Sequence, residues 1–199
     1  NRYMRKALML GVVFFLIGFT ILSFSFYQDI QYAHEDEKML EDFFASEYQS
    51  DNVNMSKNDS KTNDSENYIN SYLAVIEIPS LNLKTGIVMS NSSFTTMDRN
   101  VSIYPTSTMP DQHGNFILFA HSGNSRTSYF KNIWNLKIED EIYIYYHNVK
   151  YVYKVSNVSE VSMYNNKPIE NEGKDKITLI TCNPHDYSVR IVVKKEKHE

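Results

Sequence analysis

The chain has few cysteines, prolines and glycines, and cysteine is the residue on which small disulfide-bonded or zinc-bound domains depend. Its 199 residues include one cysteine, five prolines and six glycines. A single thiol excludes an internal disulfide and is too few for a cysteine-based zinc site. The net charge is only −4, with both signs present, so no nucleic-acid partner is indicated. Fifteen tyrosines and eleven phenylalanines favour a β-rich domain instead, and the length allows one such domain with appendages.

One long hydrophobic run stands out near the N-terminus. Residues 7–26 carry no charge, and at about 1.5 Å per residue they span about 30 Å, the hydrocarbon thickness of a bilayer. Basic residues precede the run and acidic residues follow it, which predicts a cytoplasmic tail at 1–6 and an extracellular remainder. A cleaved signal peptide is the alternative, but the run is long for one. We therefore expect an uncleaved transmembrane signal anchor in the cell membrane.

The segment that follows the run, residues 27–67, divides by composition into two parts. Apolar residues recur loosely over 27–48 and predict a short amphipathic juxtamembrane helix. Residues 49–67 are almost wholly Asn, Asp, Ser, Lys and Thr, which cannot bury enough apolar surface to become ordered. We expect a flexible polar linker there, ahead of a folded domain at 68–199.

The folded domain carries mainly the signals of short strands. His147 and Asn148 lie between two such strands and predict a tight hairpin turn. One stretch, 128–137, has apolar residues at roughly helical spacing. Many short strands with little helix favour a closed or nearly closed antiparallel barrel. The expected strands are 72–79, 83–89, 115–121, 141–146, 149–155, 176–182 and 188–195.

The only cysteine, Cys182, ends one of the last two expected strands, and Arg190 lies within the other. If these strands form an antiparallel hairpin without a bulge, side-chain alternation sets their faces. The apolar residues on the core faces are then Ile177, Leu179, Val189, Ile191 and Val193. Cys182 and Arg190 therefore project together from the opposite side, near one end of the hairpin.

A lone thiol on an exported domain is either buried and inert or chemically active. To attack a carbonyl it must become a thiolate, which a neighbouring imidazole can assist. Of six histidines, four lie in the juxtamembrane segment, in turns or in the C-terminal tail. The remaining candidates are His121, which ends an apolar strand, and His185, three residues after Cys182.

Three motifs, which follow one another along the chain as a histidine, a cysteine and an arginine motif, resemble those of the sortases. The sortases are the cysteine transpeptidases of Gram-positive bacterial surfaces. The segment TLITC at 178–182 matches the TLxTC box of that family, Ala120-His121 matches its short histidine motif, and Arg190 matches its arginine. The resemblance covers roughly residues 72–196. It implies an eight-stranded β-barrel with one or two short helices, in which His121, Cys182 and Arg190 cluster at a groove.

The resemblance also implies a reaction. The Cys182 thiolate would attack the Thr-Gly bond of an LPxTG-like sorting signal in a secreted surface protein. Arg190 would stabilise the oxyanion, and His121 would act as general acid and then as general base. The thioacyl-enzyme would pass its acyl group to an amine, either of a lipid-linked peptidoglycan precursor or of a pilin lysine. No metal or other cofactor is implied, and the acidic run 139–141 is interpreted as a solvated strand entry rather than a calcium site.

Two departures and two alternatives accompany this interpretation. The short segment between Cys182 and Arg190 predicts a modest groove wall, and the lack of a long helical insertion argues against class B while leaving the class open.

The first alternative is an anchored cysteine hydrolase with the same site and water as acceptor. The second is a membrane-tethered, non-catalytic β-domain that binds a cell-wall or protein partner, with Cys182 unreactive.

Overall fold

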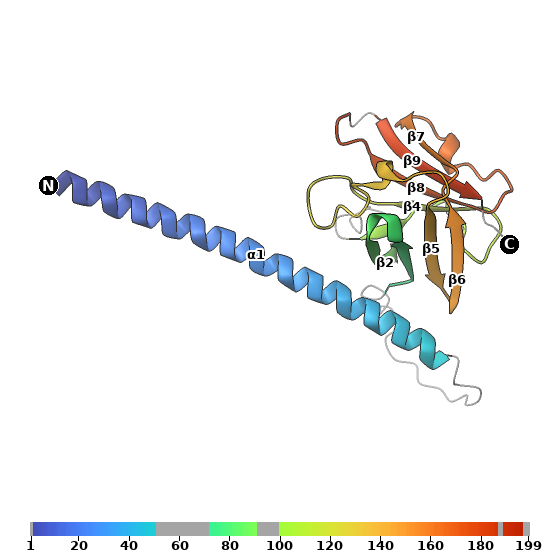
Figure 1. Cartoon of the computed structure of the whole chain (residues 1–199), viewed down its shortest axis with the longest axis horizontal. Helices are drawn as coiled ribbons and strands as arrows, with labels where there is room; N and C mark the ends of the chain where they lie inside the picture. Colours follow the sequence, from blue (N-terminus) through green and yellow to red (C-terminus); the bar gives the residue numbers. More distant parts are fainter. Residues whose placement is uncertain (1, 51–71, 91–99, 187–188, 197–199) are drawn as a thin grey trace. The chain divides into compact units, whose positions relative to one another are not determined.

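The computed structural model describes residues 2–50, 72–90, 100–186 and 189–196 (Figure 1). The chain divides into two compact units, Asn1–Lys38 and Met39–Glu199. A single helix, α1 (Arg2–Ser50), accounts for the described part of the first unit and enters the second. The separate anchor and juxtamembrane helices expected at 7–26 and 27–48 are thus one continuous helix. No glycine or proline occurs between residues 19 and 50 to end it. Most of the expected linker, from residue 51, lies outside the described residues.

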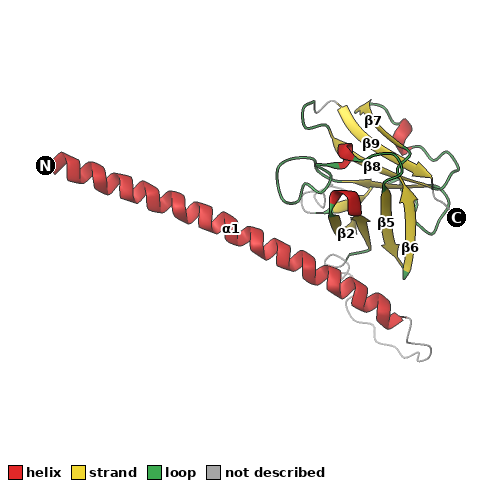
Figure 2. Ribbon diagram, viewed as in Figure 1, coloured by secondary structure: helices red, strands yellow, loops and turns green. Residues whose placement is uncertain are grey.

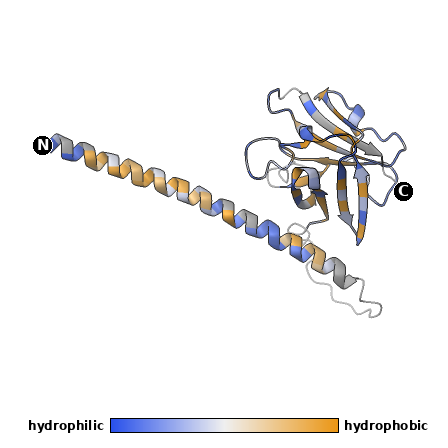
Figure 3. Ribbon diagram, viewed as in Figure 1, coloured by the Kyte–Doolittle hydropathy of each residue, from blue (hydrophilic) through white to orange (hydrophobic). Residues whose placement is uncertain are grey.

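The N-terminal part of α1 is apolar on all sides. The 21 residues Leu8–Gln28 are long and apolar enough to cross a membrane, by length and composition, and none of this stretch is buried within the structure. Figure 3 shows the hydrophobic colours along it. Exposed apolar surface of this extent is costly in water and stable in hydrocarbon, which suits a membrane segment.

The second unit is built on one curled sheet, whose edges in the described part are β6 and β7 (Figure 2). The strand order is β6-β5-β1-β2-β3-β4-β8-β9-β7. The strands are β1 (Ala74–Ile78), β2 (Leu83–Met89), β3 (Val101–Ile103), β4 (Asn115–Phe119), β5 (Glu141–Tyr146), β6 (Val149–Lys154), β7 (Asn157–Ser162), β8 (Lys176–Cys182) and β9 (Val189–Glu196). The mainly β class is confirmed. The described sheet has nine strands, the seven expected from the sequence together with β3 and β7, where the family resemblance implied a barrel of eight.

The sheet is mixed rather than wholly antiparallel. β2 pairs with β3, and β4 pairs with β8, in parallel. The second parallel pair matters most, because β5, β6 and β7 lie between its two strands in the chain. A parallel pair requires such a long crossover connection, which the strand signals alone do not reveal.

Helical structure in the second unit, apart from the end of α1, is limited to short turns in the described residues. These are the 3-10 turns η1 (Pro79–Leu81), η3 (Ile133–Asn135) and η4 (Lys167–Ile169). The helix expected over 128–137 is reduced to η3. The apolar residues Phe130, Ile133 and Leu136 of this stretch are nevertheless buried in the main core. Successive single turns can direct these side chains toward the core, as a helix would.

The core lies on the faces that alternation predicts. Ile177, Leu179 and Val193 belong to the main core cluster, together with Phe116 and Leu118 of β4. The side chains of Val189 and Ile191 fall outside the described part. β4 is buried at every position, as expected for a central strand covered on both faces. Each large apolar side chain buried here contributes roughly 1.5–3 kcal/mol, which fixes the register of β4, β8 and β9.

A smaller cluster joins the end of α1 to the outer face of the sheet within the second unit. Phe43 packs with Tyr72 and Val75. The Phe44 ring meets the Tyr145 ring edge-on, with centroids 5.4 Å apart. These contacts attach the last turns of α1 to β1 and β5 without involving the main core.

Candidate active site

The ends of three neighbouring strands bring the sequence-predicted site residues together. In the parallel pair, Phe119 of β4 lies opposite Ile180 of β8. His121 follows two residues after Phe119, and Cys182 two residues after Ile180, so both are at the same end of the pair. Cys182 in turn lies opposite Arg190 of β9. The structure therefore places all three residues at one end of β4, β8 and β9.

Two hydrogen bonds, one made by the backbone and one by a side chain of β8, join this strand to the residue before His121. The Ala120 N–H donates to the Ile180 carbonyl at 3.3 Å, and the Thr181 hydroxyl donates to the Ala120 carbonyl at 2.7 Å. Thr181 is 3% exposed, so the loss of its hydroxyl would leave a buried carbonyl without this donor, at a cost of about 1–3 kcal/mol. Thr181 thus fixes the segment that carries His121 against the strand that carries Cys182.

The thiol is accessible rather than sealed in the interior. Cys182 is half-buried, and His121 and Arg190 are half-buried as well. Cys182 and Arg190 lie on the face opposite the core residues Leu179 and Val193, since each pair is separated by three positions along its strand. The hairpin alternation expected from the sequence is therefore confirmed for these positions.

Cys182 and His121 line one cavity, which we call the serine pocket. Its volume is about 290 Å³. The lining residues are His121, Ser122, Gly123, Asn124, Ser125, Ser128 and Cys182. The loop after His121 forms most of this pocket and closes on itself, because the Phe130 N–H donates to the His121 carbonyl at 3.1 Å.

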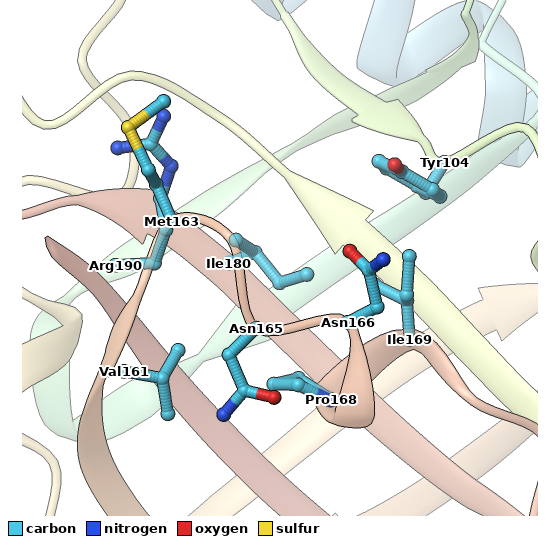
Figure 4. A pocket seen from close by; sticks show the side chains of 9 residues that line it. All are labelled: Tyr104, Val161, Met163, Asn165, Asn166, Pro168, Ile169, Ile180 and Arg190. Carbon is cyan, nitrogen blue, oxygen red and sulfur yellow. The ribbon is translucent and has the colours of Figure 1, made fainter. Parts of the chain in front are cut away.

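Arg190 lines a second cavity, the apolar groove, on the same face of the sheet as Cys182. Its volume is about 120 Å³. Figure 4 shows Arg190 and Met163 on one side of the groove and Tyr104 on the other. Ile180 lines it too, two residues before Cys182. The lining residues are Tyr104, Val161, Met163, Asn165, Asn166, Pro168, Ile169, Ile180 and Arg190.

A buried asparagine fixes one wall of the apolar groove to the sheet. Asn115 of β4 donates from Nδ2 to the carbonyl oxygens of Pro168, at 3.0 Å, and Glu170, at 3.3 Å. Its Oδ1 accepts a hydrogen bond from the Thr178 hydroxyl at 2.7 Å. Since Pro168 belongs to η4, this network holds the η4 wall at a set distance from β4 and β8.

Of the two histidines that the sequence leaves as candidates, only His121 shares a described cavity with Cys182. The His185 side chain is exposed, and its backbone N–H donates to Asn183 Oδ1 at 2.8 Å. Asn183 also donates from Nδ2 to Glu160 Oε1 at 3.0 Å. The residue next to Cys182 is thus held from two sides, while His185 lines neither described cavity.

No group of three or more His, Cys, Asp or Glu side chains that could hold a metal ion occurs in the described ranges. The acidic run at 139–141 has protein partners. Glu139 pairs with Lys154 at 3.6 Å, Asp140 accepts a hydrogen bond from the Lys137 N–H, and Glu141 accepts one from the Tyr143 hydroxyl. The interpretation of this run as a solvated strand entry fits these contacts.

Sequence reasoning missed most of the lining of both cavities. Tyr104 follows β3, and Met163 follows β7, the two strands that were not predicted. Ser122 and Ser128 belong to a loop whose polar composition was visible, but a loop sequence does not reveal which hydroxyls point toward a distant cysteine. Only folding of the sheet brings these segments to Cys182.

Comparison with known proteins gives one consistent family. A family model described as the Sortase domain matches residues 76–198. Sortase A of Bacillus anthracis is 34% identical over 119 residues, which are 59% of this chain and 56% of that protein; the chain thus matches little more than half of that relative's length. The solved structure of a lid mutant of sortase A from Corynebacterium diphtheriae is 26% identical, with a TM-score of 0.59 over 64% of this chain and 70% of that chain.

A second solved structure is similar to the same degree. Clostridium perfringens sortase C, determined with the C-terminal cell wall sorting motif, is 27% identical, with a TM-score of 0.58 over 65% of this chain and 71% of that chain. The fold that the sequence motifs implied is confirmed by these neighbours. Their labels, A and C, leave the class open.

Proposed function

Because this chain belongs to the sortase family, we propose that it is a cysteine transpeptidase that cleaves a sorting signal and transfers the resulting acyl group to an amine. The observation that carries the proposal is the position of Cys182. It lines the serine pocket together with His121, and it lies opposite Arg190, which lines the apolar groove. A donor and an acceptor can therefore approach one sulfur from two cavities.

Cys182 is the proposed nucleophile. Its thiolate attacks the scissile carbonyl carbon and forms a C–S bond, while the carbonyl π electrons move onto oxygen. The tetrahedral intermediate then expels the amine by breaking the C–N bond, and a thioester remains. The half-buried position at the wall of a cavity gives the substrate access to the sulfur.

Arg190 is the proposed oxyanion donor. Its guanidinium is permanently charged and presents several N–H groups in a fixed plane. It lies opposite Cys182 across the β8–β9 pair and lines the apolar groove. Removal of an oxyanion donor lowers the rate by about 10²–10³-fold, so we expect Arg190→Ala to show a loss of this order in kcat.

His121 is the proposed general acid and base. In the first half-reaction the imidazolium protonates the departing amine. In the second, the neutral imidazole takes the proton from the attacking amine as the C–S bond breaks and the thiolate re-forms. Both steps require the imidazole to lie beside the sulfur, and His121 and Cys182 line the same pocket.

The donor is an LPxTG-like sorting signal, cleaved between Thr and Gly. We place its apolar residues in the groove, where Val161, Met163 and Ile169 provide apolar contacts. Support comes from the similar Clostridium perfringens sortase C, which was solved with a cell wall sorting motif. The acceptor is an amine, either of a lipid-linked peptidoglycan precursor or of a pilin lysine.

Membrane anchoring suits this chemistry. Sortases are membrane-associated, and α1 includes the apolar stretch Leu8–Gln28. We propose a single-pass cell-membrane protein with a cytoplasmic N-terminus and an extracellular catalytic domain, because basic residues precede the stretch. Both the secreted donor and a lipid-linked acceptor would then lie on the same side of the membrane.

The test uses the 199-residue chain purified in detergent with a library of fluorogenic LPxTG-type peptides. We expect cleavage by the wild type, none by Cys182→Ala, and conversion of the product to a hydroxamate when hydroxylamine is added. Cleavage that yields only the hydrolysis product in the presence of amines would identify a hydrolase instead. No cleavage of any library member, with or without hydroxylamine, would favour the non-catalytic binding domain.

A further inference from the structure

The only tryptophan of the chain lies on the surface, in the connection between β4 and β5. Trp134 belongs to η3 and is 53% exposed, and Ile138, four positions later, is 67% exposed. Lys131 and Lys137 are exposed as well, and neither forms an ion pair with another residue of the described ranges. We call Lys131, Trp134, Lys137 and Ile138 the tryptophan patch.

The local backbone holds the indole ring at the surface. Ile133 and Leu136, on either side of this position, are buried in the main core, and the Leu136 N–H donates to the Ile133 carbonyl at 3.2 Å. The indole N–H of Trp134 donates to the Lys131 carbonyl at 2.9 Å. The polar edge of the ring is thus satisfied within the turn, and its apolar face is left to meet solvent or a partner.

The charges around the patch leave it slightly positive. Glu139 pairs with Lys154 at 3.6 Å, and Asp140 Oδ2 accepts a hydrogen bond from the backbone N–H of Lys137 at 3.0 Å. With Lys131, these residues make three lysines and two carboxylates, which leaves one net positive charge. The patch therefore offers exposed apolar surface beside ammonium groups that can meet an anion.

This combination of side chains suits the surface of a bilayer. Single exposed apolar residues are common and need no explanation. A tryptophan with an aliphatic neighbour and flanking lysines is different, because indole rings favour the headgroup region and lysines extend toward lipid phosphates. A bilayer would also be close, since an anchor in Leu8–Gln28 would keep the second unit at a high effective concentration beside it.

We propose that the tryptophan patch docks onto the anionic surface of the bilayer in which the chain is anchored. Trp134 and Ile138 enter the headgroup region, and Lys131 and Lys137 meet lipid phosphates. This inference goes beyond the proposed reaction and depends only on the proposed anchor. The Lys131 N–H donates to the carbonyl of Ser128, a lining residue of the serine pocket, at 3.1 Å. Docking would therefore hold that pocket at a set height above the lipid.

The test uses the fact that Trp134 is the sole tryptophan, so that selectively excited indole fluorescence reports on this patch alone. The 199-residue chain is reconstituted into vesicles of equal parts phosphatidylglycerol and phosphatidylcholine. The phosphatidylcholine is either unmodified or brominated near the headgroup end of its acyl chains, where bromine quenches an indole in contact with it. We expect the Trp134 emission to be quenched in the brominated vesicles. The quenching should weaken with added salt, which screens the lysines, and in vesicles of phosphatidylcholine alone.

Variants test each part of the patch. Lys131→Glu combined with Lys137→Glu should lose most of the quenching, because like charges then face the lipid phosphates. Ile138→Ser should reduce the quenching in anionic and neutral vesicles alike, because it removes apolar contact and leaves the charge unchanged. These positions are exposed, and circular dichroism checks that the variants fold. The salt dependence of the wild type tests the electrostatic contact without any variant.

A matched control moves the tryptophan to another exposed site. Val149 is 48% exposed and lies opposite Tyr146, at the far end of the β5–β6 hairpin. Since β5 begins three residues after Ile138, Val149 is about one strand length, roughly 20 Å, from the end of the hairpin nearest the patch. In Trp134→Phe combined with Val149→Trp, the emission should be quenched little.

Three results would overturn the proposal. Equal quenching at positions 134 and 149 would mean that no particular face meets the lipid. Absence of quenching at Trp134 in vesicles that contain the chain would mean that the patch does not dock. A Trp134 emission shift with soluble poly(glycerol phosphate), without quenching by lipid, would assign the patch to an anionic polymer.

The anchor and the reaction are tested separately. Extraction of the chain from the vesicles by alkaline carbonate would refute the anchor, and the quenching measured in the same vesicles before extraction would still decide the docking. Peptide cleavage in detergent requires no bilayer and is independent of every outcome above.

Discussion

Each threonine of the TLITC segment has a structural partner on β4 or on the residue that follows it. The Thr178 hydroxyl donates to Asn115 Oδ1, and the Thr181 hydroxyl donates to the Ala120 carbonyl. The two side chains leave β8 on opposite faces, since they are three positions apart. Both faces of β8 are thereby attached to the strand that leads to His121. These threonines set the distance between nucleophile and imidazole, and neither lines a described cavity.

The first prediction concerns Asn115. In Asn115→Ala the carbonyl oxygens of Pro168 and Glu170 lose the hydrogen bonds from Asn115 Nδ2, and the η4 wall of the apolar groove loses its attachment to β4. Pro168 then keeps only the long 3.5 Å hydrogen bond from the Thr178 hydroxyl. We expect the KM for the donor peptide to rise by about 3- to 10-fold and the free energy of unfolding to fall by about 1–3 kcal/mol. Steady-state kinetics and urea unfolding of the two proteins measure these effects.

A graded variant controls this prediction. Thr178→Val removes the hydroxyl that donates to Asn115 Oδ1 at 2.7 Å and, weakly, to the Pro168 carbonyl at 3.5 Å. It keeps both groove contacts of Asn115, so its effect on the donor KM should be smaller. If Asn115→Ala lost stability while its donor KM stayed at the wild-type value, Asn115 would have no part in positioning the groove wall.

The sequence could predict which candidate catalytic residues lie together, but not their surroundings. Cys182, His121 and Arg190 were identified because each ends or occupies an apolar strand in a known order of motifs. The strand pairing then places them together. Tyr104 and Met163 carry no comparable pattern, because an aromatic or a methionine at a strand end is common in any β-rich chain. Their position beside Arg190 depends on the crossover between β4 and β8.

At the level of elements, strands with clear hydrophobic patterns were predicted well. The turn at His147 and Asn148 is confirmed by backbone φ angles of 49° and 61°, both in the left-handed region that such hairpins require. β7 was missed because NVSEVS at 157–162 does not alternate and, at the edge of the sheet, buries little. β3 was missed because three residues are too few to establish a period.

The contact between α1 and the sheet provides the second prediction, which concerns pH. Burial raises the pKa of Tyr145 to about 12, and the hydrogen bond from its hydroxyl to Glu77 contributes in the same direction. A tyrosine in the unfolded chain ionises near pH 10. The folded state therefore retains this proton more tightly, and its stabilising effect is complete below about pH 10 and lost as the pH rises through about 12.

The expected result is a fall in the free energy of unfolding between about pH 10 and pH 12. Urea unfolding at several pH values, followed by circular dichroism, measures it. In Tyr145→Phe the free energy of unfolding should fall less steeply over this interval. The other tyrosines still titrate in both proteins, but position 145 no longer titrates in the variant. Equal slopes in the wild type and the variant would show that Tyr145 does not contribute.

For the molecule as a whole, a single cysteine allows orientation in the membrane to be measured directly. The third prediction is that a membrane-impermeant maleimide labels Cys182 in intact protoplasts that express the chain, because the proposed topology places the second unit outside. In a Cys182→Ala background, Ser156→Cys should be labelled in the same way and Tyr3→Cys should be protected until the cells are lysed. Tyr3 precedes the apolar stretch, and both control positions are exposed.

The opposite pattern would reverse the proposed topology. Labelling of Tyr3→Cys in intact cells, with protection of Ser156→Cys, would place the second unit in the cytoplasm. Labelling of Ser156→Cys but not of Cys182 would leave the topology intact and would mean that the half-buried thiol is shielded from reagents of this size.

The parallel pairing of β4 with β8 has a consequence for the timing of activity. His121 and Cys182 are neighbours in the sheet, but the segment 122–181, with β5, β6 and β7, separates them along the chain. Contacts this distant in sequence form late and slowly. A chain that is only partly folded therefore cannot turn over its substrate. The rate at which activity recovers after dilution from denaturant would report the rate at which β4 and β8 pair.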